Sequence, residues 1–124
     1  MGPVEQAFRA RLQAPHTYRT ISRRVPFALR SMGHDGIVIE LGDRRTPTSV
    51  SWECLESVPP FMRAHRGWVK SGGVHNADAE PGTLHAHLLG WVPRDIANWV
   101  VALLLEAGLV DVDKGPPLLL RLRL

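Results

Sequence analysis

The last quarter of the chain, residues 94–124, reads RDIANWVVALLLEAGLVDVDKGPPLLLRLRL. A helix is predicted over 94–107 because apolar side chains recur there at helical spacing, at Ile96, Val100, Leu103 and Leu104. Gly108 suits the position just after a helix, where the backbone often turns left-handed. Two apolar runs, 109–113 and 118–124, flank the turn sequence Lys-Gly-Pro-Pro and predict a β-hairpin.

A shorter helix is predicted directly before this stretch. Thr83 can cap a helix over 84–90, in which Leu84 and Leu88 lie on one face. The sequence Gly-Trp-Val-Pro then forms a short turn, whose Pro93 suits a position at or just before the next helix. The C-terminal third therefore reads helix, turn, helix, hairpin.

In this order, and in the phrase LLLEAGLVDVD, residues 83–124 resemble the winged helix-turn-helix family. The resemblance covers about a third of the chain and implies a fold more than a function, because winged helices also serve as protein-interaction modules. In that family the second of the paired helices enters the major groove of DNA, and the hairpin touches phosphates.

The resemblance implies a set of DNA contacts on the helix and the hairpin. Asn98 is expected to read a base, and Arg94 to reach a guanine or a phosphate. Lys114 lies at the hairpin tip, and the alternation of the last strand puts Arg121 and Arg123 on one face. The alternative for these two arginines is an ordinary solvated strand face.

The helix predicted over 94–107, which would enter the major groove, carries less positive charge than DNA binding requires. With its apolar stripe buried, its opposite face carries Asp95, Asn98, Ala102 and Glu106. The two carboxylates would repel DNA phosphates, whose neutralisation supplies most of the affinity of such proteins. Further apolar residues widen the surface beyond one core face: Trp99, Val101 and Leu105. This favours burial on both sides of the helix, against an N-terminal sheet or across a dimer interface formed by Trp99 and Leu105.

The N-terminal part predicts a helix and an antiparallel meander. The predicted helices are 3–13 and a short 52–57, stopped by Pro59-Pro60, and the predicted strands are 17–22, 25–31, 37–41, 48–52 and 66–70. Pro26 indicates that the second strand is an edge or only begins there. We therefore expect an α+β fold, with the helix and sheet (1–70) joined by a loop (71–82) to a winged helix (83–124) in one compact domain.

The positive charge lies mainly in the N-terminal half. The chain has a net charge of +3, and residues 1–70 hold eleven basic and six acidic side chains, against four and six in 71–124. The arginines most able to converge at one end of the meander are Arg19, Arg23, Arg24, Arg44 and Arg45. Arginine forks suit phosphate, so Arg23, Arg24, Arg44 and Arg45 are predicted DNA contacts. The alternative is scattered arginines that pair with Glu40, Asp43, Glu53 and Glu56.

Several classes of site are not supported by the sequence. Cys54 is the one cysteine, so a disulfide within the chain or a cysteine-based zinc site cannot form, and we expect a buried, inert thiol. His85 and His87, even with His75 and Asp78 nearby, are predicted to be surface residues and not metal ligands. No catalytic motif, secretory signal or membrane-spanning run is present, so we expect a cytoplasmic protein without enzyme activity, cofactor, metal or membrane contact.

These observations predict a non-catalytic protein that binds double-stranded DNA, with a role in transcription regulation or as an accessory reader of the bacterial restriction type. The alternative is a protein-interaction or homodimerisation module that uses a winged helix without touching DNA. A third possibility is a pocket for a small ligand or a modified base between the sheet and the winged helix, lined by tryptophans.

Overall fold

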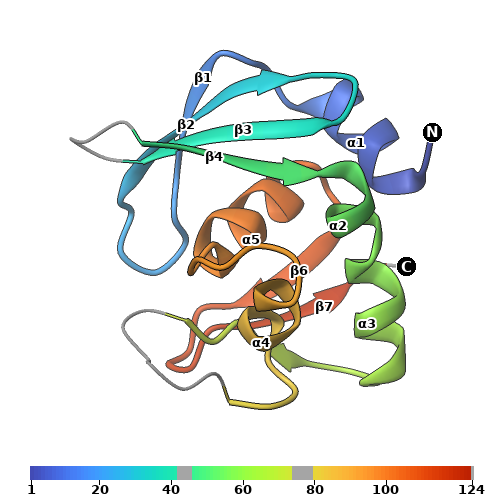
Figure 1. Ribbon diagram of the computed structural model, residues 1–124. Helices are drawn as coiled ribbons and strands as arrows, with labels where there is room; N and C mark the ends of the chain where they lie inside the picture. The colour runs from blue at the N-terminus through green and yellow to red at the C-terminus, as the bar shows by residue number, and fades with distance from the viewer. Residues whose placement is uncertain (42–45, 74–79, 124) are drawn as a thin grey trace.

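Two antiparallel sheets lie on opposite sides of one central helix, α5 (Ala97–Glu106), in the computed structural model (Figure 1). The structure describes residues 1–41, 46–73 and 80–123. The first sheet has the order β1-β2-β3-β4, formed by His16–Arg19, Pro26–Met32, Gly36–Leu41 and Thr46–Ser51. The second has the order β5-β7-β6, formed by Val69–Lys70, Leu119–Leu122 and Val110–Asp113. The fold is mixed α+β, as predicted.

The four-stranded sheet is the predicted meander, and its inner face is apolar. Alternate residues of β2 and β3 are buried, among them Leu29 and Ile39, which are paired across the two strands. Pro26 is the first residue of β2, an interior strand of the sheet, so the prediction that a strand begins there is confirmed. Gly36 must be glycine because a Cβ at this position would overlap the backbone of Val50.

The first three helices of the chain differ in part from the prediction. Helix α1 spans Pro3–Arg11 and α2 spans Trp52–Glu56, close to the predicted bounds. The predicted short helix ends before Pro59-Pro60, but a further helix that was not predicted, α3 (Val58–Ala64), holds both prolines in its first turn. Proline is tolerated in the first turn of a helix, where the backbone has no internal acceptor for the missing N–H.

The C-terminal elements follow the predicted order. Helix α4 spans Leu84–Leu89, and the Thr83 hydroxyl accepts a hydrogen bond of 3.1 Å from the Ala86 amide, which confirms the predicted cap. Gly108 has a positive φ of 76°, as expected of the residue that ends α5. Helix α5 begins later than predicted, at Ala97. Strand β5 is shorter than the predicted 66–70, and it pairs with β7, so part of the predicted N-terminal segment joins the C-terminal sheet.

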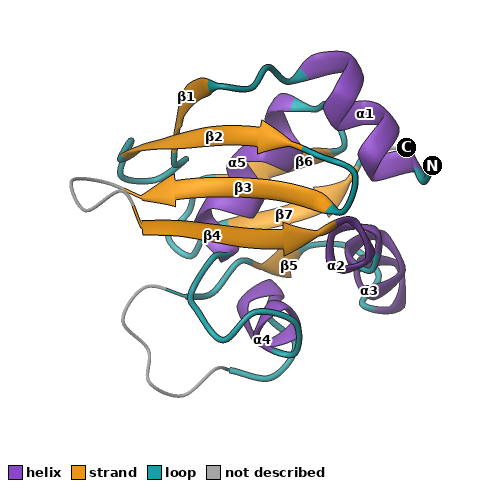
Figure 2. Ribbon diagram, turned by 45° about the horizontal axis from the view of Figure 1, so that its top comes forward, coloured by secondary structure: helices purple, strands orange, loops and turns teal. Residues whose placement is uncertain are grey.

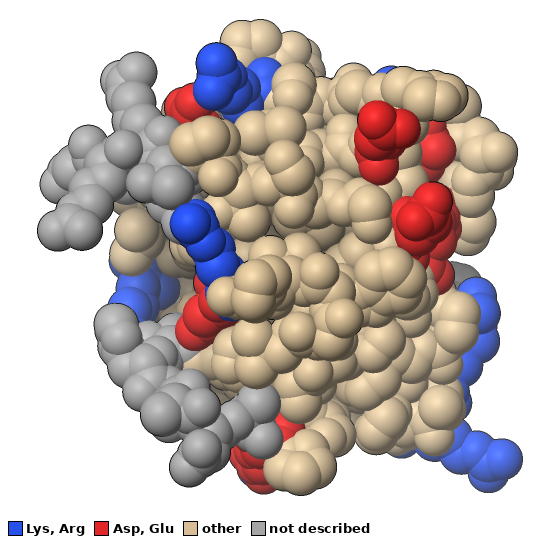
Figure 3. All heavy atoms as spheres, in the orientation of Figure 1, with Lys and Arg blue, Asp and Glu red and all other residues tan. Residues whose placement is uncertain are grey.

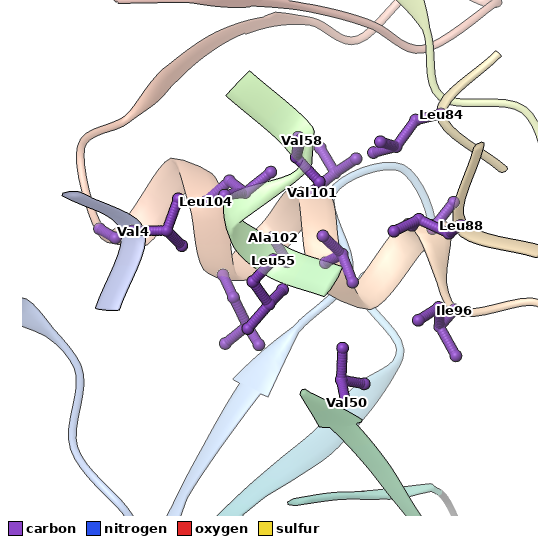
Figure 4. Packing of buried hydrophobic residues seen from close by; sticks show 14 of the residues in the cluster. Val4, Val50, Leu55, Val58, Leu84, Leu88, Ile96, Val101, Ala102 and Leu104 are labelled. Carbon is purple, nitrogen blue, oxygen red and sulfur yellow. The ribbon is translucent and has the colours of Figure 1, made fainter. Parts of the chain in front are cut away.

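Helix α5 is the centre of the hydrophobic core. Figure 4 shows buried side chains from α1, β4, α2, α3 and α4 gathered around it. Its buried residues are Ala97, Val100, Val101, Ala102, Leu103 and Leu104. Ala102, which was predicted on the exposed face, is 1% exposed, because sheets cover this helix from two sides. Among the residues of α5, all of which the structure describes, Glu106 alone is exposed.

A carboxylate from α2 caps the start of α1. The two carboxylate oxygens of Glu56 accept hydrogen bonds from the backbone amides of Val4 (3.0 Å) and Glu5 (2.9 Å). A negative charge at this end also stabilises the helix, because it interacts favourably with the positive end of the helix dipole. A Cβ at Gly2 would overlap the Glu56 carboxylate, so glycine leaves the space that this contact needs. The contact fixes the N-terminal helix to the helices that follow the sheet.

Replacing this cap should lower the stability of the fold. We expect Glu56→Ala to reduce the free energy of unfolding by about 1–2 kcal/mol, because two helix-end amides lose a charged acceptor. Glu53→Ala is the control, since Glu53 is an exposed carboxylate of the same helix, and its effect should stay within about 0.5 kcal/mol. Urea denaturation measures both, and equal values for the two variants would contradict the role of Glu56.

Candidate nucleic-acid interface

A pocket of ≈ 1070 Å³ opens at the N-terminal end of α5, between the four-stranded sheet and the C-terminal elements. We call it the α5 pocket. It is lined by the β1–β2 turn, the segment after β5, helix α4, the start of α5 and the β6–β7 turn, through Thr20, Ser22, Arg23, Val25, Gly72, Gly73, His85, Leu89, Pro93, Arg94, Asp95, Asn98, Trp99, Pro116, Pro117 and Leu118. Both halves of the chain therefore contribute to one concave site.

The β1–β2 turn holds an arginine at the wall of this pocket. The turn is closed by Thr20, whose hydroxyl accepts from the Val25 amide (2.9 Å) and whose own amide donates to the Val25 carbonyl (3.0 Å). Arg19 donates to the Arg24 carbonyl at 2.9 Å and braces the same turn. Arg23 lines the pocket, and Arg24 is exposed beside it with a φ of 55°. Of the predicted arginine cluster, Arg44 and Arg45 lie outside the described residues.

The start of α5 brings two more predicted residues to the same pocket. The guanidinium of Arg94 donates to the hydroxyl of Thr48, a buried residue of β4, at 3.1 Å. This bond spans from the α4–α5 connection to the first sheet. Asn98 and Trp99 are half-buried in the pocket wall. Arg23, Arg94 and Asn98, predicted as separate DNA contacts, are therefore members of one site.

A buried histidine lies in the pocket, contrary to the prediction of a surface residue. His85 is 4% exposed, and its Nδ1 lies 3.6 Å from Oδ1 of Asp95. Its backbone amide donates to the Ser71 carbonyl at 2.9 Å, which ties the start of α4 to the segment after β5. Among the described residues, Nδ1 of His85 has no hydrogen-bond partner. This burial could not be predicted from the sequence, because it depends on the contact between α4 and the segment after β5.

His87 belongs to a different contact, away from the pocket. Its Nε2 lies 2.8 Å from the Ser57 hydroxyl, and its ring stacks on Phe61 with centroids 4.5 Å apart. The Ser57 hydroxyl donates to the Cys54 carbonyl, so the imidazole is the donor to Ser57 and does not activate it as a nucleophile. Burial, and then the positive charge of His65, lower the pKa of His87 below 6.5. This contact joins the α2–α3 junction to α4.

The two arginines of the last strand share one carboxylate. Asp111 on β6 lies 3.7 Å from Arg121 and 3.0 Å from Arg123, and Arg121 also stacks over Trp68 at 4.5 Å. Both arginines thus lie on one face, as predicted, but a paired arginine offers less charge to a phosphate. Lys114 is exposed in the β6–β7 turn and has no ion-pair partner among the described residues.

The predicted interface residues are part of the chain's own packing. Trp99 and Leu105 are half-buried and pack against the core. The large apolar side chains that are exposed include Trp68 and Trp91. On the face shown in Figure 3, Lys and Arg side chains lie in separate groups and do not form one continuous patch.

The part of the chain that the structure describes gives little evidence for a metal site, a reactive cysteine or a membrane-spanning helix. No group of three or more His, Cys, Asp or Glu side chains that could hold a metal is present there, and His75 and Asp78 lie outside the described residues. Cys54 is buried, and burial raises the pKa of its thiol to about 11, which confirms the prediction of an inert cysteine. None of the described helices is both long and apolar enough to cross a bilayer.

The chain shows no match to a protein-family model, to a curated protein or to a solved structure.

The lowered pKa of His87 predicts a pH-dependent stability. At a pH below 6.5 the unfolded chain binds a proton at His87 more readily than the folded chain does. The contribution of neutral His87 to the free energy of unfolding is therefore complete above pH 6.5. It is lost as the pH falls toward the lower pKa that His87 has in the folded chain. We expect the urea concentration at the midpoint of unfolding to decrease less below pH 6.5 in His87→Gln than in the wild-type chain. This variant keeps a hydrogen-bond donor near Ser57 but cannot bind the proton. His34→Gln, at an exposed position, is the control and should leave the fall unchanged. An unchanged fall in His87→Gln would contradict this assignment.

Proposed function

We propose that the protein binds double-stranded DNA without catalysing a reaction, in a regulatory role or as an accessory reader. The observation that carries the proposal is that Arg23, from the N-terminal half of the chain, lines the α5 pocket together with Arg94 and Asn98, from the C-terminal half. Two guanidinium groups and an amide suit contact with phosphates and base edges. A cytoplasmic location, expected from the sequence, is part of this proposal.

We further propose that the C-terminal elements form a winged helix. The order of α4, α5 and the β6–β7 hairpin supports this interpretation, and β5 adds a third strand beside β7. The short connection between α4 and α5 is also consistent with paired helices.

The mode of DNA contact proposed here differs from the one that the resemblance implies. Burial of α5 from both sides leaves only Glu106 exposed, so this helix has no free face to lay in a major groove. We propose instead that DNA meets the mouth of the α5 pocket, where the β1–β2 turn brings Arg23 and the α4–α5 connection brings Arg94. Lys114, exposed in the β6–β7 turn, would add a phosphate contact.

Self-association through Trp99 and Leu105 is the less supported alternative. Both side chains pack against the core of their own chain, and Trp99 also lines the α5 pocket. An interface built on them would have only their remaining exposed surface to use. A protein-interaction role without DNA therefore lacks a specific surface among these residues.

The salt dependence of DNA binding tests the proposal. The slope of log affinity against log salt reports the number of phosphates neutralised, at about 0.9 per phosphate. We expect Arg23→Ala and Arg94→Ala each to weaken binding to a mixed-sequence duplex and to reduce this slope by about 1. Arg63→Ala is the matched control, because Arg63 is an exposed arginine on α3 that does not line the pocket.

Fluorescence anisotropy at several salt concentrations measures these slopes. Thermal unfolding of each variant separates a lost contact from a lost fold, which matters for Arg94 because it also bonds Thr48. The absence of binding by the wild-type chain at low salt would overturn the DNA proposal. Equal losses in Arg63→Ala and Arg23→Ala would show that general positive charge, and not the α5 pocket, attracts the duplex.

A further inference from the structure

The polar groups of the α5 pocket are recessed, which limits what can touch them. His85 is 4% exposed, and Asp95 and Asn98 are half-buried. A base in a stacked duplex offers only its edge, at the floor of a groove. A base that contacts recessed groups in a protein pocket must first leave the stack. The depth of these groups therefore favours a single unstacked unit over an intact base pair.

The pocket is large enough for such a unit. Its volume of ≈ 1070 Å³ is just above the range of roughly 300–1,000 Å³ in which proteins enclose compact organic ligands. Two large apolar side chains that line it are unusually exposed, Val25 at 46% and Leu89 at 37%. A ligand that covers them gains affinity by removing apolar surface from water.

Several of the lining groups match the parts of a nucleotide, whereas the Asp95 carboxylate, which also lines the pocket, would repel a phosphate placed beside it. Arg23 and Arg94 supply positive charge and forked donors for a phosphate. The half-buried indole of Trp99 provides an aromatic surface on which a base can stack.

The remaining polar groups suit the edge of that base. The amide of Asn98 both donates and accepts, as recognition of a base edge requires. The buried Nδ1 of His85, which has no hydrogen-bond partner among the described residues, offers a further polar atom in the same pocket.

We propose that the α5 pocket takes one unstacked nucleotide, with its phosphate on Arg23 and Arg94 and its base against Trp99 and Asn98. This inference rests on the proposed DNA-binding function for its source, a nucleotide extruded from the duplex. A free nucleotide presents the same chemistry, so the test includes both sources.

Three probes are compared with the full chain at one salt concentration. The first is a fully paired duplex, the second is the same duplex with one unpaired nucleotide, and the third is a set of free deoxynucleoside monophosphates. An unpaired nucleotide leaves the stack at a lower cost, so we expect the second duplex to bind about tenfold more tightly than the first. Binding in the pocket should also quench the fluorescence of Trp99.

Two pairs of variants assign the signals to the pocket. Asn98→Ala should lose most of the preference for the unpaired duplex, whereas Gln13→Ala, an exposed amide outside the pocket, should keep it. Trp99→Phe should lose the quenching, whereas Trp91→Phe should keep it, because Trp91 is exposed and lines a different hollow. Thermal unfolding confirms that each variant is folded.

The outcomes separate this inference from the DNA proposal. Equal affinity for the two duplexes, unchanged by Asn98→Ala, would overturn the nucleotide pocket and leave DNA binding intact. Binding of free deoxynucleoside monophosphates without any duplex binding, with quenching that needs Trp99, would support the pocket and overturn DNA as its source. The absence of binding to all three probes would overturn both.

Discussion

The burial of α5 between two sheets is the constraint on which the rest of the structure depends. Four apolar residues in succession, from Val101 to Leu104, leave this helix without a polar side over its central turns. A helix that is apolar all round is stable only when it is enclosed. The N-terminal sheet and the C-terminal hairpin meet that need from opposite sides (Figures 1 and 2), so neither half has a complete core without the other.

Enclosing the middle of α5 confines its polar chemistry to its ends. At the N-terminal end, Arg94, Asp95 and Asn98 lie in the gap between the two halves, and the β1–β2 turn brings Arg23 to the same gap. The hydrogen bond from Arg94 to Thr48 joins the α4–α5 connection to β4 at this end of α5. The pocket is thus a consequence of how the core is closed, and its residues come together only in the folded chain.

The local elements could be predicted from the sequence because their causes are local. Helical spacing, the Thr83 cap and Gly108 defined α4, α5 and the start of the hairpin within a few residues. The pocket could not be predicted, because it depends on contacts between segments distant in the sequence. His85 was predicted to be a surface residue because nothing beside it in the chain shows that α4 contacts the segment after β5. Helical geometry alone likewise placed Ala102 on an open face that a second sheet covers.

The distribution of ion pairs favours the pocket over the two arginines near the C-terminus as the place where the proposed nucleic acid would meet positive charge. Asp111 lies within ion-pair distance of both Arg121 and Arg123, so a phosphate would have to compete with a carboxylate already in place. Arg23 and Arg94 have no ion-pair partner among the described residues, and both line the concave site, where Arg94 is held by its hydrogen bond to Thr48. Other exposed basic side chains are likewise without an ion pair among the described residues, including Arg63, Arg66 and Lys114, so general attraction to phosphates would add to the contacts in the pocket. In the proposed mode of binding, the recessed groups of the pocket supply what general attraction does not, namely contacts that distinguish a single unstacked nucleotide from a phosphate backbone.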